Sequence, residues 1–510
     1  MFPSDFSVNS KVVSFSGTGL FSGVSSTSAT FVPDATNNKV TIKGVCTAGV
    51  ATNSNSIVYI FSMDNPAQKK TTDSLQVSLL TASGAAVMRK TSGIVLAEGS
   101  IETGTVGSIA TSSLTTTEVQ KATRLRFDFT PTHAVSASSQ IVLTVPSSLT
   151  LGASCSVATV SGGLDAGATC ASDNVAKTMT ISSPFGSSGF AGGSALQLAV
   201  DGASNPVSVL TVGGFSVATY NIIDGSPYMI DMGTGGASDY TATQGSIVAP
   251  KSATPASAEA SKTPVVYTIA FTTSNNIPLG GKVKISFPSG IVISDTSSAS
   301  CTGTKGFQTV GLTCNPTSSS LEITNGFSAD FTAGELELTV AGVSNPRSTL
   351  ATGSFSVTTT DSSDNVIDAT TTGMTVTMSS VPDLGSVSVA GTDKTNGAST
   401  DYTFDIVPGP TLVDGDYLTI AFPTETTLPG SLSTCEAVAV ITTITCQIQV
   451  GGAVKVTLSA LSGGTATSSQ TMKFRIGLVT NPPNTQTSSA FTVRAYDSAD
   501  NQIAQYAADP

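Results

Sequence analysis

Six of the seven cysteines in this 510-residue chain have a spacing that points to specific chemistry. They form three short-range pairs, and each pair recurs at the same place in one of three similar segments. Regular local pairs are typical of disulfides, which persist in oxidising compartments. Each disulfide would close a short loop and contribute about 3 kcal/mol in the chain-entropy estimate. The predicted disulfides join Cys155 to Cys170, Cys301 to Cys314, and Cys435 to Cys446.

Cys46 is the seventh cysteine, and it has no partner in its own segment. Two interpretations are open: a buried, inert thiol, or a disulfide between two chains. A metal site at any of the cysteines is not indicated, because no second Cys or His pair lies nearby.

Residue sets for catalysis are missing from the sequence. His133, the one histidine, lies in a predicted loop, where a histidine is far more often exposed than catalytic. No Cys–His or Ser–His–Asp set can be assembled without another histidine. The chain has no nucleophile elbow, P-loop or HExxH motif, and its lack of tryptophan weakens a sugar-binding role. We therefore expect a protein that is not an enzyme and that holds no organic cofactor.

Acidic turns are the one candidate for a cation site. Asp361, Asp364 and Asp368 lie close together in sequence. Clustered carboxylates on a loop suit the hard cation Ca²⁺, although this spacing does not match an EF-hand. Turns held by short Asp and Asn side chains are the simpler interpretation. Calcium at these three residues is a second hypothesis.

The segments that carry these residues belong to a long internal repeat, which has to be recognised before the fold is interpreted. An Asn-Pro pair marks each copy, and the copies follow in steps of 140, 140 and 136 residues. Each pair lies between an apolar residue five positions before it and two more at ten and twelve positions after it. The four asparagines are Asn65, Asn205, Asn345 and Asn481.

The repeat has the pattern of β-structure. In "ELELTV", alternation places Leu336, Leu338 and Val340 on one face of a strand. Asn-Pro then ends the strand, because proline lacks an N–H and holds the preceding residue extended. We predict an all-β chain of four tandem antiparallel Ig-like β-sandwich units, the first and last incomplete. The predicted units are residues 1–106, 107–244, 245–384 and 385–510.

Composition and charge limit the partners and the compartment. A net charge of −12 argues against nucleic acid, which requires basic stripes. No apolar run is long enough for a membrane span. "MFPSDFSVNS" lacks the regions of a signal peptide, so either Met1 is not the biological start or export is arranged otherwise. None of the 19 asparagines lies in an N-glycosylation sequon, whereas O-linked glycans on the Ser and Thr runs stay open. With the disulfides, this predicts an extracellular or cell-surface protein.

The two outer units have opposite defects in the repeat. We assign "KVVSF" (11–15) as the counterpart of the later "KVKISFP" strand, so with only ten residues before it the first unit should lack its first strand, and its second strand is left open. The fourth unit should lack its last strand, because the counterpart of "GMTVTM" (373–378) would begin at position 509. Three outcomes are open: loops cover the gap, the chain is part of a longer array, or another copy inserts a strand. The predicted donor side chains are Phe2, Phe6 and Val8.

The pattern "NP-x-ST-x-x-T-x-SF-x-V-x-T-x-D" at Asn345 to Asp361 is similar to tandem repeats of very large secreted surface proteins of ciliates, algae and related microbes. The resemblance covers most of residues 107–510. It implies extracellular β-sandwich arrays that form surface fibrils or hair-like appendages.

Together these observations predict a structural subunit of an extracellular filament or surface coat. Copies of the chain would polymerise head to tail by strand exchange, since a contact between different surfaces builds a helical filament. The alternative is a monomeric adhesin stalk that holds out a binding head. A weaker third hypothesis is a set of accessory modules of an extracellular enzyme.

Overall fold

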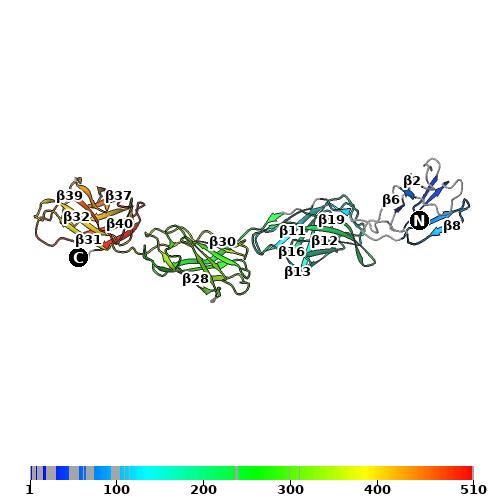
Figure 1. Cartoon of the computed structure of the whole chain (residues 1–510), viewed down its shortest axis with the longest axis horizontal. Coiled ribbons are helices and arrows are strands. Elements are labelled where there is room, and N and C mark those ends of the chain that lie inside the picture. The colour runs from blue at the N-terminus through cyan, green and yellow to red at the C-terminus, as the bar shows by residue number, and fades with distance from the viewer. Residues whose placement is uncertain are drawn as a thin grey trace. The chain divides into compact units, whose positions relative to one another are not determined.

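A computed structural model of the chain is all-β, which confirms the predicted fold class (Figure 1). No helix occurs in the part of the chain that the structure describes, and therefore none there is long and apolar enough to cross a membrane. The chain divides into two compact units, residues 1–243 and 244–510, which are described separately. The described residues are 2, 7–8, 15–18, 30–44, 57–60, 63–64, 74–93, 104–107, 109–113, 115–235, 239–297, 299–308, 311–432 and 434–507.

The described strands within the first hundred residues form two-stranded antiparallel pairs. One of these pairs corrects a predicted register: Phe15 lies opposite Ile60, as Leu125 lies opposite Val200 in the next copy. The strand at Phe15 is thus the counterpart of the second strand of a later unit and not of "KVKISFP". Four pairs are described: β1 (Ser7–Val8) with β6 (Met63–Asp64), β2 (Phe15–Thr18) with β5 (Ile57–Ile60), β3 (Thr30–Asp34) with β4 (Lys39–Lys43), and β7 (Val77–Leu80) with β8 (Ala86–Lys90).

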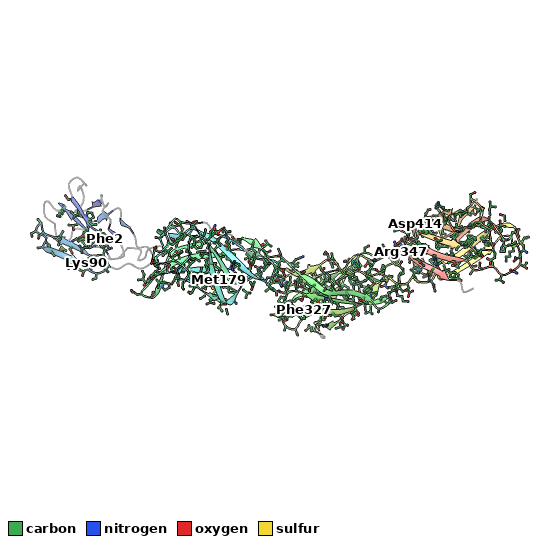
Figure 2. The ribbon with its side chains drawn as sticks, turned by 180° about the vertical axis from the view of Figure 1, so that it is seen from behind. Phe2, Lys90, Met179, Phe327, Arg347 and Asp414 are labelled. Atoms are coloured by element: carbon green, nitrogen blue, oxygen red, sulfur yellow. A yellow bond between two sulfur atoms is a disulfide. The ribbon has the colours of Figure 1, made fainter. Side chains whose placement is uncertain are left out.

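Residues 104–243, called the second sandwich, form two sheets around one core. Along β11 (Ala122–Phe129) alternate side chains are buried, as period-two patterning requires, and Met179 (Figure 2) lies fully inside. Asp224 and Gly225, both at positive φ, make the two-residue turn that joins β18 (Ser216–Ile223) to β19 (Ser226–Thr234). One sheet has the order β10 (Ala110–Ser113), β11 (Ala122–Phe129), β16 (Leu196–Ser204), β13 (Thr150–Ser161). The other has β14 (Thr169–Asp173), β15 (Thr178–Ser182), β12 (Ser139–Thr144), β18 (Ser216–Ile223), β19 (Ser226–Thr234), β9 (Gly104–Thr105), and β17 (Thr211–Val212) pairs with β20 (Tyr240–Thr241).

Residues 244–380, called the third sandwich, repeat this plan with one change. Strand β21 (Gly245–Pro255) is long enough to pair in both layers, antiparallel to β22 (Val265–Thr273) in one and parallel to β30 (Val366–Thr370) in the other. The strands of the two layers are therefore hydrogen-bonded into one continuous sheet. Its order is β24 (Val292–Ile293), β28 (Glu335–Ser344), β22 (Val265–Thr273), β21 (Gly245–Pro255), β30 (Val366–Thr370), β29 (Ser356–Thr360), β23 (Lys282–Ser286), β27 (Ser320–Thr324), β26 (Thr313–Pro316), with β25 (Cys301–Lys305) also on β28.

Residues 384–507, called the fourth sandwich, have a separate core between a four-stranded and a five-stranded sheet. Phe404 and Phe474 stack at its centre with ring centroids 5.3 Å apart. The four-stranded order is β31 (Ser386–Gly391), β32 (Ser399–Val407), β39 (Met472–Thr480), β35 (Cys435–Ala439). The five-stranded order is β36 (Ile441–Ile448), β37 (Ala453–Leu461), β34 (Tyr417–Ala421), β40 (Thr492–Tyr496), β41 (Gln502–Ala507), and β33 (Leu412–Val413) pairs with β38 (Thr465–Ala466).

Candidate functional site

The repeated asparagine is a buried clamp in the three copies that the structure describes, and Asn65 lies outside the described residues. Asn205, Asn345 and Asn481 are only 2%, 5% and 7% exposed. In each, the side-chain amide donates to two backbone carbonyls of the segment between the first two strands of its sandwich. Both amide hydrogens are thus used, so no buried donor is left unpaired. The acceptors are Thr116 and Glu118 for Asn205, Ser257 and Glu259 for Asn345, and Asp393 and Thr395 for Asn481, at 2.7–2.9 Å.

A tyrosine hydroxyl completes the clamp by donating to the asparagine Oδ1. Tyr267 reaches Asn345 in this way, and Tyr402 reaches Asn481 at 2.7 Å. The second sandwich has Leu125 of β11 at the position that Tyr267 has in β22. There the hydroxyl comes from a different strand, where Tyr240 of β20 lies 3.0 Å from Asn205 Oδ1. Burial raises the pKa of Tyr240 and Tyr267 to about 12.

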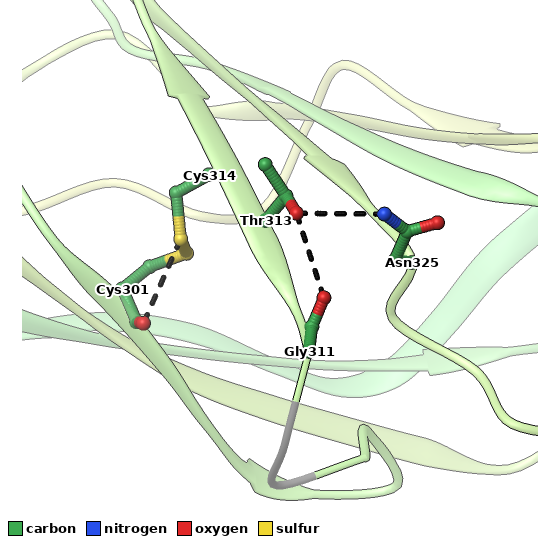
Figure 3. The surroundings of a disulfide bond; sticks show 5 residues. All are labelled: Cys301, Gly311, Thr313, Cys314 and Asn325. Carbon is green, nitrogen blue, oxygen red and sulfur yellow. Dashed lines mark hydrogen bonds between the residues drawn. A yellow bond between two sulfur atoms is a disulfide. The ribbon is translucent and has the colours of Figure 1, made fainter.

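The three predicted disulfides are formed. Each joins the outer strand of one sheet to the outer strand of the other, so it closes the sandwich along one edge. The Cα–Cα distances of 5.4, 6.1 and 5.8 Å lie in the ordinary range for disulfides. Figure 3 shows the pair Cys301–Cys314, beside the bonds of Thr313 to Gly311 and Asn325. Cys46, for which a buried thiol and a disulfide between two chains were both left open, lies outside the described residues.

His133 makes a structural hydrogen bond. Its Nδ1 lies 2.7 Å from Oδ1 of the fully buried Asp231, and its backbone N–H donates to the other carboxylate oxygen. The third sandwich has the same arrangement with Asn275 in place of the histidine and Asp368 in place of the aspartate. The carboxylate therefore needs a donor at this place, and either a histidine or an asparagine provides it.

The three calcium candidates lie in different surroundings. Asp361 accepts the backbone N–H groups of its own turn, and Asp364 pairs with Lys282 and Lys284. Asp368 is buried beside Asn275, and this burial raises the pKa of its carboxyl group. Among the described residues, no group of three His, Cys, Asp or Glu side chains is arranged to hold a metal ion. Calcium binding stays a prediction, and the three aspartates do not form one shared site for it.

The predicted donor segment is described in part. The backbone N–H of Phe2 donates to the carbonyl of Asn38, and Val8 lies opposite Met63 in its own chain. That place corresponds to Thr123 opposite Ala203 in the second sandwich. Phe6 lies outside the described residues. Donation of this segment to another copy stays a prediction, and it would require the pairing of Val8 to be released.

An uncovered edge distinguishes the fourth sandwich. In the second sandwich, β20 covers β17, and in the third, the segment around Met374 covers the same place: Phe355 N–H donates to Met374 O at 2.9 Å, and Thr352 N–H donates to Val376 O at 2.8 Å. In the fourth, residues 483–490 are exposed throughout, and no described strand pairs with them. As a result Phe491 is half-buried, whereas its counterparts Phe215 and Phe355 are completely buried.

A second stretch of the same edge is uncovered as well. Val119 donates its N–H to Thr243 O in the second sandwich, and Ala260 donates to Ser380 O in the third. Both side chains are completely buried. Their counterpart in the fourth sandwich, one residue after the clamp acceptor Thr395, is Asn396, which is exposed. The edge that we call the acceptor edge thus consists of residues 394–396 and 484–491.

The sequence pattern did not predict several of these features. Tyr267 and Tyr402 lie 78 and 79 residues before their asparagines, so only the strand registers, which place them opposite Val340 and Ile476, show that they share a position. Asp231 and Asp368 gave no local signal, because their hydrogen-bond partners lie more than ninety residues away in sequence. The sequence predicted a fourth unit without its last strand, and which residues line the edge that no described strand covers depends on strands that pair across the sandwich.

Comparisons with known proteins give only distant likenesses. No family model and no curated protein sequence matches the chain. The C-terminal domain of the Streptococcus pyogenes antigen I/II-family protein AspA aligns at 9% identity with a TM-score of 0.21, over 60% of this chain and 99% of that one. The N-terminal domain of the Streptococcus gordonii adhesin Sgo0707 aligns at 11% identity with a TM-score of 0.19, over 80% of this chain and 97% of that one. A marsupial T cell receptor aligns at 10% identity with a TM-score of 0.18, over 79% of this chain and 100% of that one. TM-scores this low carry no argument about function.

Proposed function

We propose that the protein is a non-enzymatic structural subunit of an extracellular filament or surface coat, in which copies join head to tail by strand exchange. The acceptor edge of the fourth sandwich is the observation that carries this proposal. An open edge presents unpaired backbone groups, and proteins normally cover such an edge. A strand from another chain would cover it with main-chain hydrogen bonds.

Other features support a structural role outside the cell. The three disulfides join the two sheets of their sandwiches and suit an oxidising environment. The conserved element of the repeat is a buried hydrogen-bonded clamp, a device that stabilises each unit. The proposal includes kinship with the tandem repeats of microbial surface proteins and O-linked glycans on the Ser and Thr runs.

Purified protein tests the proposal directly. We expect negative-stain images to show filaments and size-exclusion chromatography to show species far larger than one chain. Deletion of residues 2–8 should abolish the filaments, if the N-terminal segment is the donor, and should leave the β-content unchanged by circular dichroism. Single chains at every concentration would overturn the proposal.

The alternative, a monomeric adhesin stalk, is favoured by one observation. Val8 is already paired within its own chain, so the N-terminal segment is not free in the single molecule. Under this alternative the protein would stay monomeric, and deletion of residues 2–8 would destabilise the first unit without changing the state of association.

A further inference from the structure

A buried carboxylate of the fourth sandwich has its counter-ion in the third. Asp416 lies in the loop between β33 and β34, and it is only 2% exposed. Its Oδ2 accepts the backbone N–H of Val413 at 2.8 Å, and one guanidinium nitrogen of Arg347 donates to the same oxygen. A carboxylate that is removed from water is costly unless a cation pairs with it. The charge of Asp416 therefore depends on a residue of another sandwich.

The third sandwich holds the backbone of this arginine in place. Arg347 (Figure 2) belongs to the Asn-Pro turn that the clamp fixes, and the carbonyl of Pro346 in that turn accepts the N–H of Ser261 at 2.8 Å. The arginine side chain is 41% exposed, so its guanidinium keeps part of its water while it neutralises Asp416. Burial raises the pKa of the Asp416 carboxyl, and the charge of Asp497 raises it further, whereas Arg347 lowers it. The arginine thus favours the charged form of the carboxylate that it binds.

The segment that connects the two sandwiches is hydrogen-bonded to both of them. The carbonyl of Ser380 accepts the N–H of Ala260 in the third sandwich at 2.9 Å. Two residues later, the carbonyl of Pro382 accepts the N–H of Gln505 in the fourth at 3.2 Å. One residue, Val381, lies between these two bound positions, and the proline after it has a fixed φ. Domain rotation needs residues that can change φ and ψ by large amounts, so this segment has little freedom to act as a hinge.

The ion pair is an addition to the repeat and not a requirement of its fold. Counted from the clamp asparagine, Val207 of the second sandwich corresponds to Arg347. Gly281, just before β23, corresponds to Asp416, just before β34, because these two strands pair in the same register with β29 and β40. Neither Val207 nor Gly281 is charged. A sandwich of this kind therefore folds without a charge at either place, and what the pair adds is a bond between two sandwiches.

We propose that the ion pair of Arg347 and Asp416 holds the third and fourth sandwiches together as one rigid body. The pair is anchored in a fixed turn on one side and in a buried loop on the other, and the bound connecting segment limits rotation about it. Removal of either side chain releases the contact, and the fourth sandwich then moves about the segment around Val381. This inference goes beyond the proposed function, because it concerns a single chain whether or not chains associate.

The distance distribution between two spin labels in the full-length protein tests the inference. Ser252 of β21 and Ser388 of β31 are exposed and lie in different sandwiches, so Ser252→Cys and Ser388→Cys can carry the labels. Cys46→Ser leaves these as the reactive thiols, because the other six cysteines are in disulfides. The labelled chains are diluted in unlabelled protein, so that only distances within one chain are measured. Double electron–electron resonance should give one narrow distribution, and a broad one would overturn the inference.

Two substitutions taken from the other copies remove the pair. Arg347→Val introduces the residue of the second sandwich, and Asp416→Gly introduces that of the third. Each should at least double the width of the distance distribution. Arg475→Ala, which removes an ion pair with Glu436 inside the fourth sandwich, is the matched control and should leave the width unchanged. Circular dichroism establishes that the variants are folded, and an unchanged width in Arg347→Val or in Asp416→Gly would contradict the inference.

A double variant tests whether the two residues act through one contact. If they do, Arg347→Val combined with Asp416→Gly should give a distribution no broader than either single variant. Additive broadening would show that the two residues act separately, against the inference. Asp416→Asn keeps an acceptor for the N–H of Val413 and removes only the charge, and it should broaden the distribution as well. A narrow distribution in Asp416→Asn would show that the charge does not hold the two sandwiches together.

Discussion

The hydroxyl of Tyr267 donates a hydrogen bond to Oδ1 of Asn345 at 2.6 Å, and both residues are buried. The same bond in the second sandwich joins Asn205 to Tyr240, which lies on another strand. Two different routes thus bring a tyrosine hydroxyl to the asparagine that marks the repeat. The asparagine of the Asn-Pro pair thus makes the same kind of buried hydrogen bonds in all three described copies, in addition to its place in the turn.

Substitution of Asn345 by alanine should destabilise the third sandwich by about 3 kcal/mol. Two carbonyls and the Tyr267 hydroxyl would lose their partner, and an unsatisfied buried group costs about 1–3 kcal/mol. Urea denaturation of the variant should show an early transition. Asn484→Ala, at an exposed position, is the matched control and should change the free energy of unfolding by less than about 0.5 kcal/mol. Equal effects of the two substitutions would contradict a clamp.

Alkaline pH should weaken the same site. Burial raises the pKa of Tyr267 from its ordinary value of 10.0 to about 12 in the folded protein. A group whose folded pKa is raised contributes stability that is fully present below the unfolded pKa and is lost as pH rises toward the folded one. Thermal unfolding from pH 9 to 12 should therefore show falling stability above pH 10. The decline should be shallower in Tyr267→Phe, and an identical decline would argue against this tyrosine as a source.

His133 should be replaceable by asparagine but not by alanine. Asn275 makes the equivalent bond in the third sandwich, so His133→Asn should retain the stability of the second sandwich. His133→Ala would leave the buried Asp231 carboxylate without its side-chain donor, at a cost of about 2 kcal/mol. Thermal unfolding of both variants measures the difference. Equal stability of the two would show that the hydrogen bond contributes little.

Replacement of Leu478 by glycine should stabilise the fourth sandwich. Leu478 has φ of 60° and is 45% exposed, and its counterparts in the second and third sandwiches are Gly202 and Gly342, both at positive φ. Left-handed geometry costs an L-residue about 1–2 kcal/mol, and an exposed leucine contributes little burial in return. Leu478→Gly should thus raise the free energy of unfolding of the fourth sandwich by about 1 kcal/mol, which urea denaturation would measure. Leu478→Ala keeps a Cβ and should give no such gain.

Some features of this protein followed from sequence because their causes are local. Alternation in "ELELTV" defined a strand that the structure places at β28, and the short spacing of Cys301 and Cys314 was enough to predict their bond. The strand pairing of the first unit could not be predicted from the sequence. "KVVSF" resembles two different strands of the repeat, and the pairing of Phe15 with Ile60 distinguishes them.

The sequence by itself determined the all-β class, the period of the repeat and the disulfide partners, since period-two patterning and close cysteines act over a few residues. The tertiary structure decided which tyrosine completes each clamp, which carboxylates are buried and what surrounds the open edge beside Phe491. Those outcomes depend on strands that are distant in sequence and meet only when the two sheets pack. A pattern along one strand contains no information about its neighbours in space.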